Sequence, residues 1–305
     1  MQTPLTRLVA SARRLVRAAG FDVVRAGPVD AREDPRPASE IALEASRRLP
    51  KSVLVAVPTS TCRSGAGHAL DTDHPIVAAF GAGVPTSYEA SGFPAYYASY
   101  RFATACGVMG APEVEAPGFA GLPAAAFMRP WVAGDPATML HERALGMEAD
   151  ARQYGETLSI EDGMSLFGPV TRAKGEFEMR RLARVYESIR TGGYRRTAWN
   201  DGDITAWLLV RSGGAWCVQV NTGQHRAIAG AALGMESLPI RLPQAPVRRE
   251  DVEYWPQVAA GRITAEAALG MFDRVMAGQG MGTPSAAPAS AAGGGSHPAR
   301  SLHTA

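Results

Sequence analysis

The chain contains few cysteines and no long hydrophobic run. Its three cysteines, Cys62, Cys106 and Cys217, lie far apart in the sequence and form no CxxC pair. This pattern excludes a disulfide framework and a zinc site built on thiolates, and it is typical of a reducing compartment. No apolar stretch approaches the roughly 20 residues that span a bilayer. Near the N-terminus arginines interrupt every apolar stretch, whereas a secretory signal peptide has an uninterrupted apolar segment. We therefore expect a cytoplasmic protein.

The chain also has few lysines and a small net charge. Only Lys51 and Lys174 are lysines, and the formal net charge is +2. Such a balance lacks the basic surface that binding to duplex nucleic acid requires, so we expect no specific nucleic-acid partner. The chain is nevertheless 46% hydrophobic over 305 residues, which is enough for a buried core in one or two domains.

The first region, residues 1–26, contains a predicted basic amphipathic helix at 3–19. Leucine, valine and alanine recur there at helical spacing, and four arginines lie mainly off that stripe. A helix of this kind can lie on an anionic membrane surface, which would place the protein at the inner face of a membrane. It can equally pack on the body of the protein, since surface helices show the same pattern.

The second region, residues 27–165, is expected to be mainly helical and rich in loops, with an unassigned fold. After a proline-rich linker, 38–49 has a helical pattern and 52–58 reads as a buried strand. Beyond these, frequent glycine and proline residues indicate long loops between short helices. His68, His74 and His141 are scattered through this region, and no metal site is predicted from them.

The third region, residues 166–277, has clear alternation of elements and predicts an α+β fold. We expect a helix at 175–194 ended by Gly192 and Gly193, a hairpin of strands at 205–211 and 215–221, a helix at 224–233, a strand at 238–242 and a helix at 264–277 with Thr264 as N-cap. The final region, 278–305, is low in bulky apolar residues and is predicted to be disordered.

The segment Thr222–Arg226, "TGQHR", is the strongest functional candidate. Asn221 and Thr222 can cap the helix that follows, and Gly223 lets an anion approach the backbone. A helix N-terminus offers backbone N–H donors and the positive end of the helix dipole. Arg226 can add a bidentate contact to phosphate oxygens and His225 a second donor. The alternative is an ordinary turn before a core helix.

The order of these elements resembles the ParB/sulfiredoxin-like nucleotide-binding superfamily. The likeness covers about residues 175–242 and rests on a helix with a Ser-Ile pair, a hairpin, a Gly-x-His-Arg box, an alanine-rich helix and a Leu-Pro-Ile strand. In this chain those features are Ser188-Ile189, Gly193, Gly223–Arg226, Ala227, Ala229, Gly234 and Leu238-Pro239-Ile240. The segments around "FGPV", "KGEFEMRRL", "GQHR" and "VRREDVEYWPQV" also resemble a group of bacterial proteins associated with gene clusters for surface polysaccharides and glycans.

The resemblance implies a nucleoside triphosphate, ATP or CTP, with or without Mg²⁺, held by Thr222, Gly223, Gln224, His225 and Arg226. Sulfiredoxins have a cysteine immediately before the His-Arg pair, where this chain has Gln224, so the reductase chemistry is not expected. Partition proteins of the superfamily follow the box with a helix-turn-helix domain, but one convincing helix is predicted after residue 242.

Two functions remain open from the sequence. In the first, the protein is a phosphotransferase acting on a small molecule or a glycan intermediate, and a carboxylate serves as base or metal ligand. The nearest candidates by their position in the order of elements are Glu176, Glu178 and Asp203. In the second, the protein is a nucleotide-gated or partner-binding module without catalysis.

Overall fold

The computed structural model describes residues 29–47, 52–195, 203–242 and 245–282. The helix expected at 3–19 and the tail from residue 283 lie outside these ranges. One mixed sheet of seven strands organises this part of the chain, in the order β1-β2-β6-β4-β5-β3, with β7 paired to β4. Its strands are β1 (Val29–Asp30), β2 (Val53–Pro58), β3 (Cys62–Arg63), β4 (Ile204–Val210), β5 (Trp216–Thr222), β6 (Ser237–Leu242) and β7 (Val247–Arg248).

The α+β expectation is confirmed, and the sheet joins the regions expected at 27–165 and 166–277. Strand β2 pairs antiparallel with β6, and β3 pairs parallel with β5. The two regions therefore contribute to one sheet and do not form separate cores. Strands β4 and β5 form the predicted antiparallel hairpin, with Leu208 opposite Val218.

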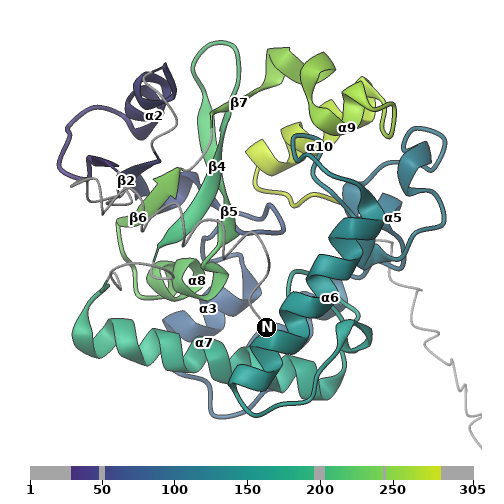
Figure 1. Cartoon of the computed structure of the whole chain (residues 1–305). Coiled ribbons are helices and arrows are strands. Elements are labelled where there is room, and N and C mark those ends of the chain that lie inside the picture. Colours follow the sequence, from purple (N-terminus) through teal and green to yellow (C-terminus); the bar gives the residue numbers. More distant parts are fainter. Residues whose placement is uncertain (1–28, 48–51, 196–202, 243–244, 283–305) are drawn as a thin grey trace, which may run out of the picture.

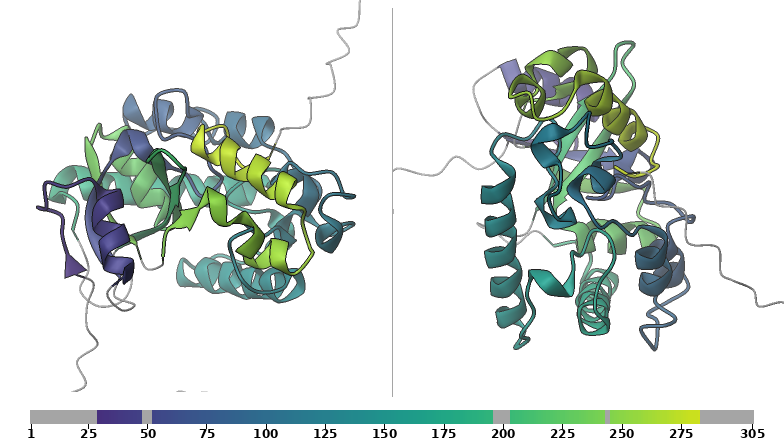
Figure 2. Two further views of the ribbon diagram at one scale, coloured as in Figure 1. Left: turned by 90° about the horizontal axis from the view of Figure 1, so that it is seen from above. Right: turned by 90° about the vertical axis from the view of Figure 1, so that its right-hand side faces the viewer.

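The helices lie on both sides of the sheet (Figure 1). They are α2 (Ala38–Arg47), α3 (Pro75–Gly81), α4 (Phe93–Ser99), α5 (Ala105–Met109), α6 (Pro136–Gln153), α7 (Arg172–Gly192), α8 (Gln224–Ala232), α9 (Pro256–Ala259) and α10 (Ala265–Met276). Short 3₁₀ turns occur at Thr59–Thr61, Pro117–Phe119, Ala124–Ala126, Ile160–Asp162 and Arg249–Tyr254. In the right-hand view of Figure 2, α7 is seen end-on below the sheet and α6 stands upright beside it.

Two hydrophobic cores follow from the alternation of side chains along β4. Ile204, Ala206 and Leu208 face the first core, which includes residues of α2, α3, α7 and α8. Trp207 and Leu209 face the second core, which includes residues of α5 and α10. Because successive residues of a strand point to opposite faces, this central strand is buried on both sides. Helix α8 is thereby held between α7 and the sheet.

The ends of several elements agree with the sequence prediction. Helix α7 ends at Gly192, and its C-cap Gly193 has a φ of 70°, which is unfavourable for other residues. The side chain of Thr264 accepts a hydrogen bond from the N–H of Ala267 at the start of α10, as an N-cap does.

The expected disorder from residue 278 is wrong for 278–282. The N–H groups of Gly280 and Met281 donate to the carbonyls of Gly67 and Ala66, and Met281 is buried. One large apolar side chain and these backbone bonds offset the ordering entropy of this short segment.

Candidate functional site

Helix α8 follows β5 directly, and the residue between them is Gly223. This residue is the N-cap of α8 with a φ of 80°, and a Cβ placed on it would lie 3.1 Å from the Cα of Ile204. The expected capping by Asn221 and Thr222 is wrong, because no side chain caps α8 and the Oγ1 of Thr222 lies 2.8 Å from the Oγ1 of Thr205. Gly223 itself occupies the N-cap position, and glycine has no side chain that could cap the helix. The first backbone N–H groups of α8 have no intrahelical partners.

Gln224 ties the start of α8 to the loop after β3, residues 64–68. Its Oε1 accepts a hydrogen bond of 2.7 Å from the N–H of Gly65. Strands β3 and β5 are parallel neighbours, so both chains leave the sheet at the same edge. Gln224 therefore positions the loop beside α8 and does not point freely into solvent.

Loop 64–68 is also held from inside the protein. The buried guanidinium of Arg129 donates from Nη2 to the carbonyl of Gly65 (2.6 Å) and from Nε to Oε1 of Gln219 (3.1 Å). The Nε2 of Gln219 donates to the same carbonyl. Burial lowers the pKa of Arg129 to about 9. Three side chains thus fix Gly65, and this loop forms a rigid wall beside α8.

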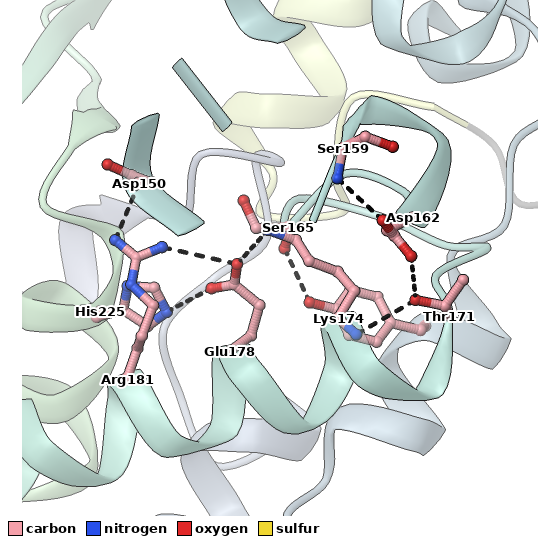
Figure 3. A network of polar contacts seen from close by, with 10 residues as sticks. Asp150, Ser159, Asp162, Ser165, Thr171, Lys174, Glu178, Arg181 and His225 are labelled. Atoms are coloured by element: carbon pink, nitrogen blue, oxygen red, sulfur yellow. Dashed lines mark hydrogen bonds and ion pairs between the residues drawn. The ribbon is translucent and has the colours of Figure 1, made fainter. Parts of the chain in front are cut away.

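His225 is oriented by Glu178, one of the predicted carboxylates. Its Nε2 lies 2.8 Å from Oε2 of Glu178, while Oε1 of Glu178 lies 2.6 Å from Nζ of Lys174. Figure 3 shows Glu178 rising from α7 towards His225 on α8. The side chain of Glu178 is 1% exposed, so this carboxylate is desolvated and depends on its partners.

The charges around Glu178 keep it ionised. Burial on its own raises the pKa of Glu178, but the hydrogen bond and charge of His225, together with the charges of Lys174 and Arg181, outweigh it and lower the pKa to about 2. Arg181 extends the network to Asp150 on α6, at 3.1 Å. Helices α6, α7 and α8 thus meet through a continuous set of charged contacts.

The structure places the other predicted site residues, Arg226, Asp203 and Glu176, in different surroundings around His225 and Glu178. Arg226 is half-buried in the first turn of α8, beside His225. Asp203 directly precedes β4, and its backbone carbonyl oxygen borders Gly223, at 3.5 Å from the position of a Cβ added there. Its carboxylate points to Arg241 and lies 3.5 Å from Nε of that residue. Glu176 is half-buried and pairs with the exposed Arg172 at 2.7 Å. Glu176 lies two residues before Glu178 on α7, so its side chain is rotated by about 200° around the helix axis and points to the opposite face.

A histidine pair that the sequence analysis treated as scattered also forms a cluster. The rings of His68 and His74 are both buried, with centroids 6.3 Å apart, and His74 stacks on Tyr96. Their spacing in sequence gives no helical or strand period that would reveal this meeting. His141 lies on α6, away from the pair in sequence and exposed. Within the described ranges, no group of three or more histidine, cysteine or acidic side chains is arranged to hold a metal ion.

The three cysteines are buried and free. Burial raises the pKa of the Cys217 thiol to about 12, which makes it an unreactive core residue. No helix of the described chain combines the length and the apolar character that crossing a membrane requires. Comparisons of the chain with models of protein families, with curated proteins and with solved structures gave no match.

Proposed function

We propose that the protein binds a nucleoside triphosphate, with the phosphates at the N-terminus of α8. The supporting observation is the first turn of that helix: Gly223 leaves it without a side-chain cap, and His225 and Arg226 lie directly behind it. The N–H groups, the helix dipole and two donor side chains provide the complementary charge for phosphate oxygens. ATP and CTP are the candidates that the resemblance to the ParB/sulfiredoxin-like superfamily suggests.

In this proposal Glu178 is a positioning residue for His225. Both of its oxygens are already within ion-pair distance of Lys174 or His225, and it is buried, so it is poorly placed to accept a proton from a substrate. By holding Nε2, it fixes the orientation of the imidazole, as a carboxylate does for many functional histidines. Asp203 is the other proposed carboxylate for a base or an Mg²⁺ ligand; its backbone borders Gly223, and its carboxylate pairs with Arg241 at 3.5 Å. Glu176 is not included.

The proposed reaction is phosphoryl transfer from the nucleotide to a small molecule or a glycan intermediate in surface polysaccharide biosynthesis. The alternative is a nucleotide-gated module that binds partners, at the membrane through 3–19, without turnover. The candidate carboxylates are both already ion-paired, Glu178 with Lys174 and His225 and Asp203 with Arg241. This favours the alternative, since a module needs no free base. Both versions use the same phosphate site and exclude specific nucleic-acid binding.

The test is a panel of ATP, CTP and GTP, with and without Mg²⁺, measured for binding by calorimetry and for turnover by phosphate release. We expect Arg226→Ala to weaken binding about ten- to a hundred-fold, since one charge-assisted contact contributes about 1.5–3 kcal/mol. Arg226→Lys should recover only part of this affinity, because an ammonium has no planar pair of donors.

Arg248→Ala is the matched control. Arg248 is an exposed arginine on β7, which pairs with the end of β4 opposite to Thr205 and Thr222, so its loss should leave nucleotide affinity unchanged. A wild-type protein that binds no nucleotide at millimolar concentration contradicts the proposal. So does an Arg226→Ala variant that is unfolded, because the arginine would then hold the fold.

A further inference from the structure

The imidazole of His225 connects the buried charged network to the protein surface. Its Nε2 lies 2.8 Å from Oε2 of Glu178, whose side chain is 1% exposed, whereas the side chain of His225 is 19% exposed (Figure 3). Among the residues that the structure describes, Nδ1 of His225 has no hydrogen-bond partner. One ring nitrogen is thus engaged by a carboxylate, and the other is available to a ligand.

The contact with Glu178 determines which ring nitrogen carries the proton. Glu178 is ionised, and a lone pair on Nε2 would repel a carboxylate oxygen at 2.8 Å. The proton of the neutral imidazole is therefore on Nε2, and Nδ1 has the lone pair. In the cationic form both nitrogens are donors, as in the phosphate contact proposed above. The neutral form makes Nδ1 the nucleophilic atom of the ring.

This ring belongs to the helix turn at which the phosphates are proposed to lie. His225 is the second residue of α8, and the N–H groups of residues 224–226 precede the first intrahelical bond, from Ala227 to Gly223. A phosphate on these N–H groups would lie next to the imidazole, and Arg226 would supply a positive charge to it. The proposed phosphate site therefore has an oriented nucleophile beside it.

We propose that His225 takes the γ-phosphoryl group of the nucleotide on Nδ1 and so forms a phosphohistidine. The inference rests on the proposed function and belongs to its catalytic version. The lone pair of Nδ1 forms a bond to the γ-phosphorus. The bond from that phosphorus to the bridging oxygen breaks, and the nucleoside diphosphate leaves with the electron pair. The proton stays on Nε2, and the charge of Glu178 balances the positive charge that the ring acquires.

The second step transfers the phosphoryl group from Nδ1 to a hydroxyl group of the acceptor. The hydroxyl oxygen bonds to the phosphorus, the bond between phosphorus and nitrogen breaks, and its electron pair returns to Nδ1. The hydroxyl proton passes to solvent. The first step needs no free carboxylate, because the imidazole is itself the nucleophile. The ion pairs of Glu178 and Asp203 therefore do not prevent turnover by this route.

The experiment follows the γ-phosphoryl group of ATP and of CTP on the full-length protein in the presence of Mg²⁺. Nucleotide labelled with ³²P at the γ-phosphate should leave a label on the protein that acid removes and alkali does not, because a bond between phosphorus and nitrogen is labile in acid. Nucleotide labelled at the α-phosphate should leave none. Mass spectrometry after an alkaline quench should locate the phosphoryl group on His225 of the wild-type protein, a readout that needs no variant to fold.

His225→Gln should abolish the label. The amide of glutamine can still donate a hydrogen bond to Glu178, but it has no nucleophilic nitrogen. Nucleotide affinity should fall by no more than about ten-fold, because at most one phosphate contact is weakened. His141→Gln is the matched control, because His141 is an exposed histidine of α6, and this variant should be labelled as the wild type is.

The inference is overturned if ATP and CTP bind but leave no acid-labile label, if the label lies on another residue, or if a folded His225→Gln variant is labelled as the wild type is. Phosphate release without a labelled protein overturns it too, because the acceptor would then attack the nucleotide directly. These results leave the proposed function intact as long as nucleotide binds and Arg226→Ala weakens it. Failure of ATP, CTP and GTP to bind overturns the proposed function and this inference together.

Discussion

The molecule buries two polar clusters in opposite ways. Glu178 is desolvated but surrounded by Lys174, His225 and Arg181, and its pKa is lowered to about 2. Burial lowers the pKa values of His68 and His74 to about 3 and about 4, and the charge of Asp71 offsets the burial of His74 only in part. Burial alone therefore removes charge, whereas burial with counter-charges preserves it.

This difference separates the surroundings of loop 64–68 into two chemical environments. On one side, Gln224 connects the loop to α8, whose first turn is held by an ionised carboxylate. Further along, the loop carries the uncharged ring of His68, which packs against the rings of Tyr96 and Tyr100. The predictions below break each cluster in turn, from the largest expected effect to the smallest.

Removing the buried carboxylate should have the largest effect. Glu178→Ala removes the ion-pair partner of the buried Lys174 and releases His225 from its partner. Breaking a buried ion pair by removing one partner costs about 3–5 kcal/mol. We expect a loss of this size in the free energy of unfolding, measured with urea at pH 7, and a lower affinity for nucleotide in whatever fraction remains folded.

Glu176→Ala is the control for that variant. Glu176 lies on the same helix, two residues away, but its pair with Arg172 is exposed. Exposed pairs contribute about 0–1 kcal/mol, so stability and nucleotide affinity should change little. If Glu178→Ala were no more destabilising than Glu176→Ala, the buried network would not hold α7 and α8 together.

Acidification should break the histidine pair before it reaches the carboxylate. Both histidines have a folded pKa below the ordinary value of 6.5, so the unfolded state binds more protons as the pH falls below 6.5. Their contribution to stability is present above pH 6.5 and is lost progressively down to the folded pKa. Between pH 6.5 and 4.5 each histidine should cost about 2 kcal/mol, because the slope reaches about 1.4 kcal/mol per pH unit only once the unfolded histidine is mostly protonated.

Glu178 acts in a lower window. Its folded pKa of about 2 lies below the ordinary 4.5, so its contribution is present above pH 4.5 and is lost as the pH falls towards 2. Urea unfolding at pH 7, 5.5 and 4.5 should therefore show a loss of stability before Glu178 begins to titrate. A free energy of unfolding that is flat from pH 7 to 4.5 would contradict the neutral histidine cluster.

The contrast between the clusters also shows what the sequence could predict. Helical spacing located α7, alternation located β4 and β5, and the Gly-Gln-His-Arg box was correctly placed at the start of α8. Glu178 was a candidate because its helix is close to the box in the order of elements. In the structure Glu178 contacts His225 because α7 packs on α8. Glu176 had the same local signal, and only the helical phase relative to α8 separates the two.

Long-range contacts were beyond this reasoning. The two residues of β3 are too short for a periodic pattern, yet their parallel pairing with β5 brings loop 64–68 to the box. The meeting of His68 with Tyr100 and Gly280 joins three segments that no local pattern relates. Likewise, the order of residues 278–282 depends on Met281 filling a site made by distant residues.

The smallest effect is expected from His74→Phe. Whether this variant is more or less stable than the wild type is the sharpest test of the difference between the two buried clusters. Both ring nitrogens of His74 are buried without a hydrogen-bond partner in the described chain, and His74 does not cap α3 with its side chain. Phenylalanine keeps a ring that can stack on Tyr96, with centroids now 5.1 Å apart, and it removes a polar group that burial penalises. The free energy of unfolding at pH 7 should therefore rise by about 1 kcal/mol. The stability lost between pH 6.5 and 4.5 should become smaller, because only His68 then contributes to it. His141→Phe, at an exposed position of α6, should change neither quantity appreciably. A His74→Phe variant that is destabilised at pH 7, with an unchanged acid slope, would show that the imidazole is bound by a partner and charged in the folded protein, which would remove the difference between the two clusters.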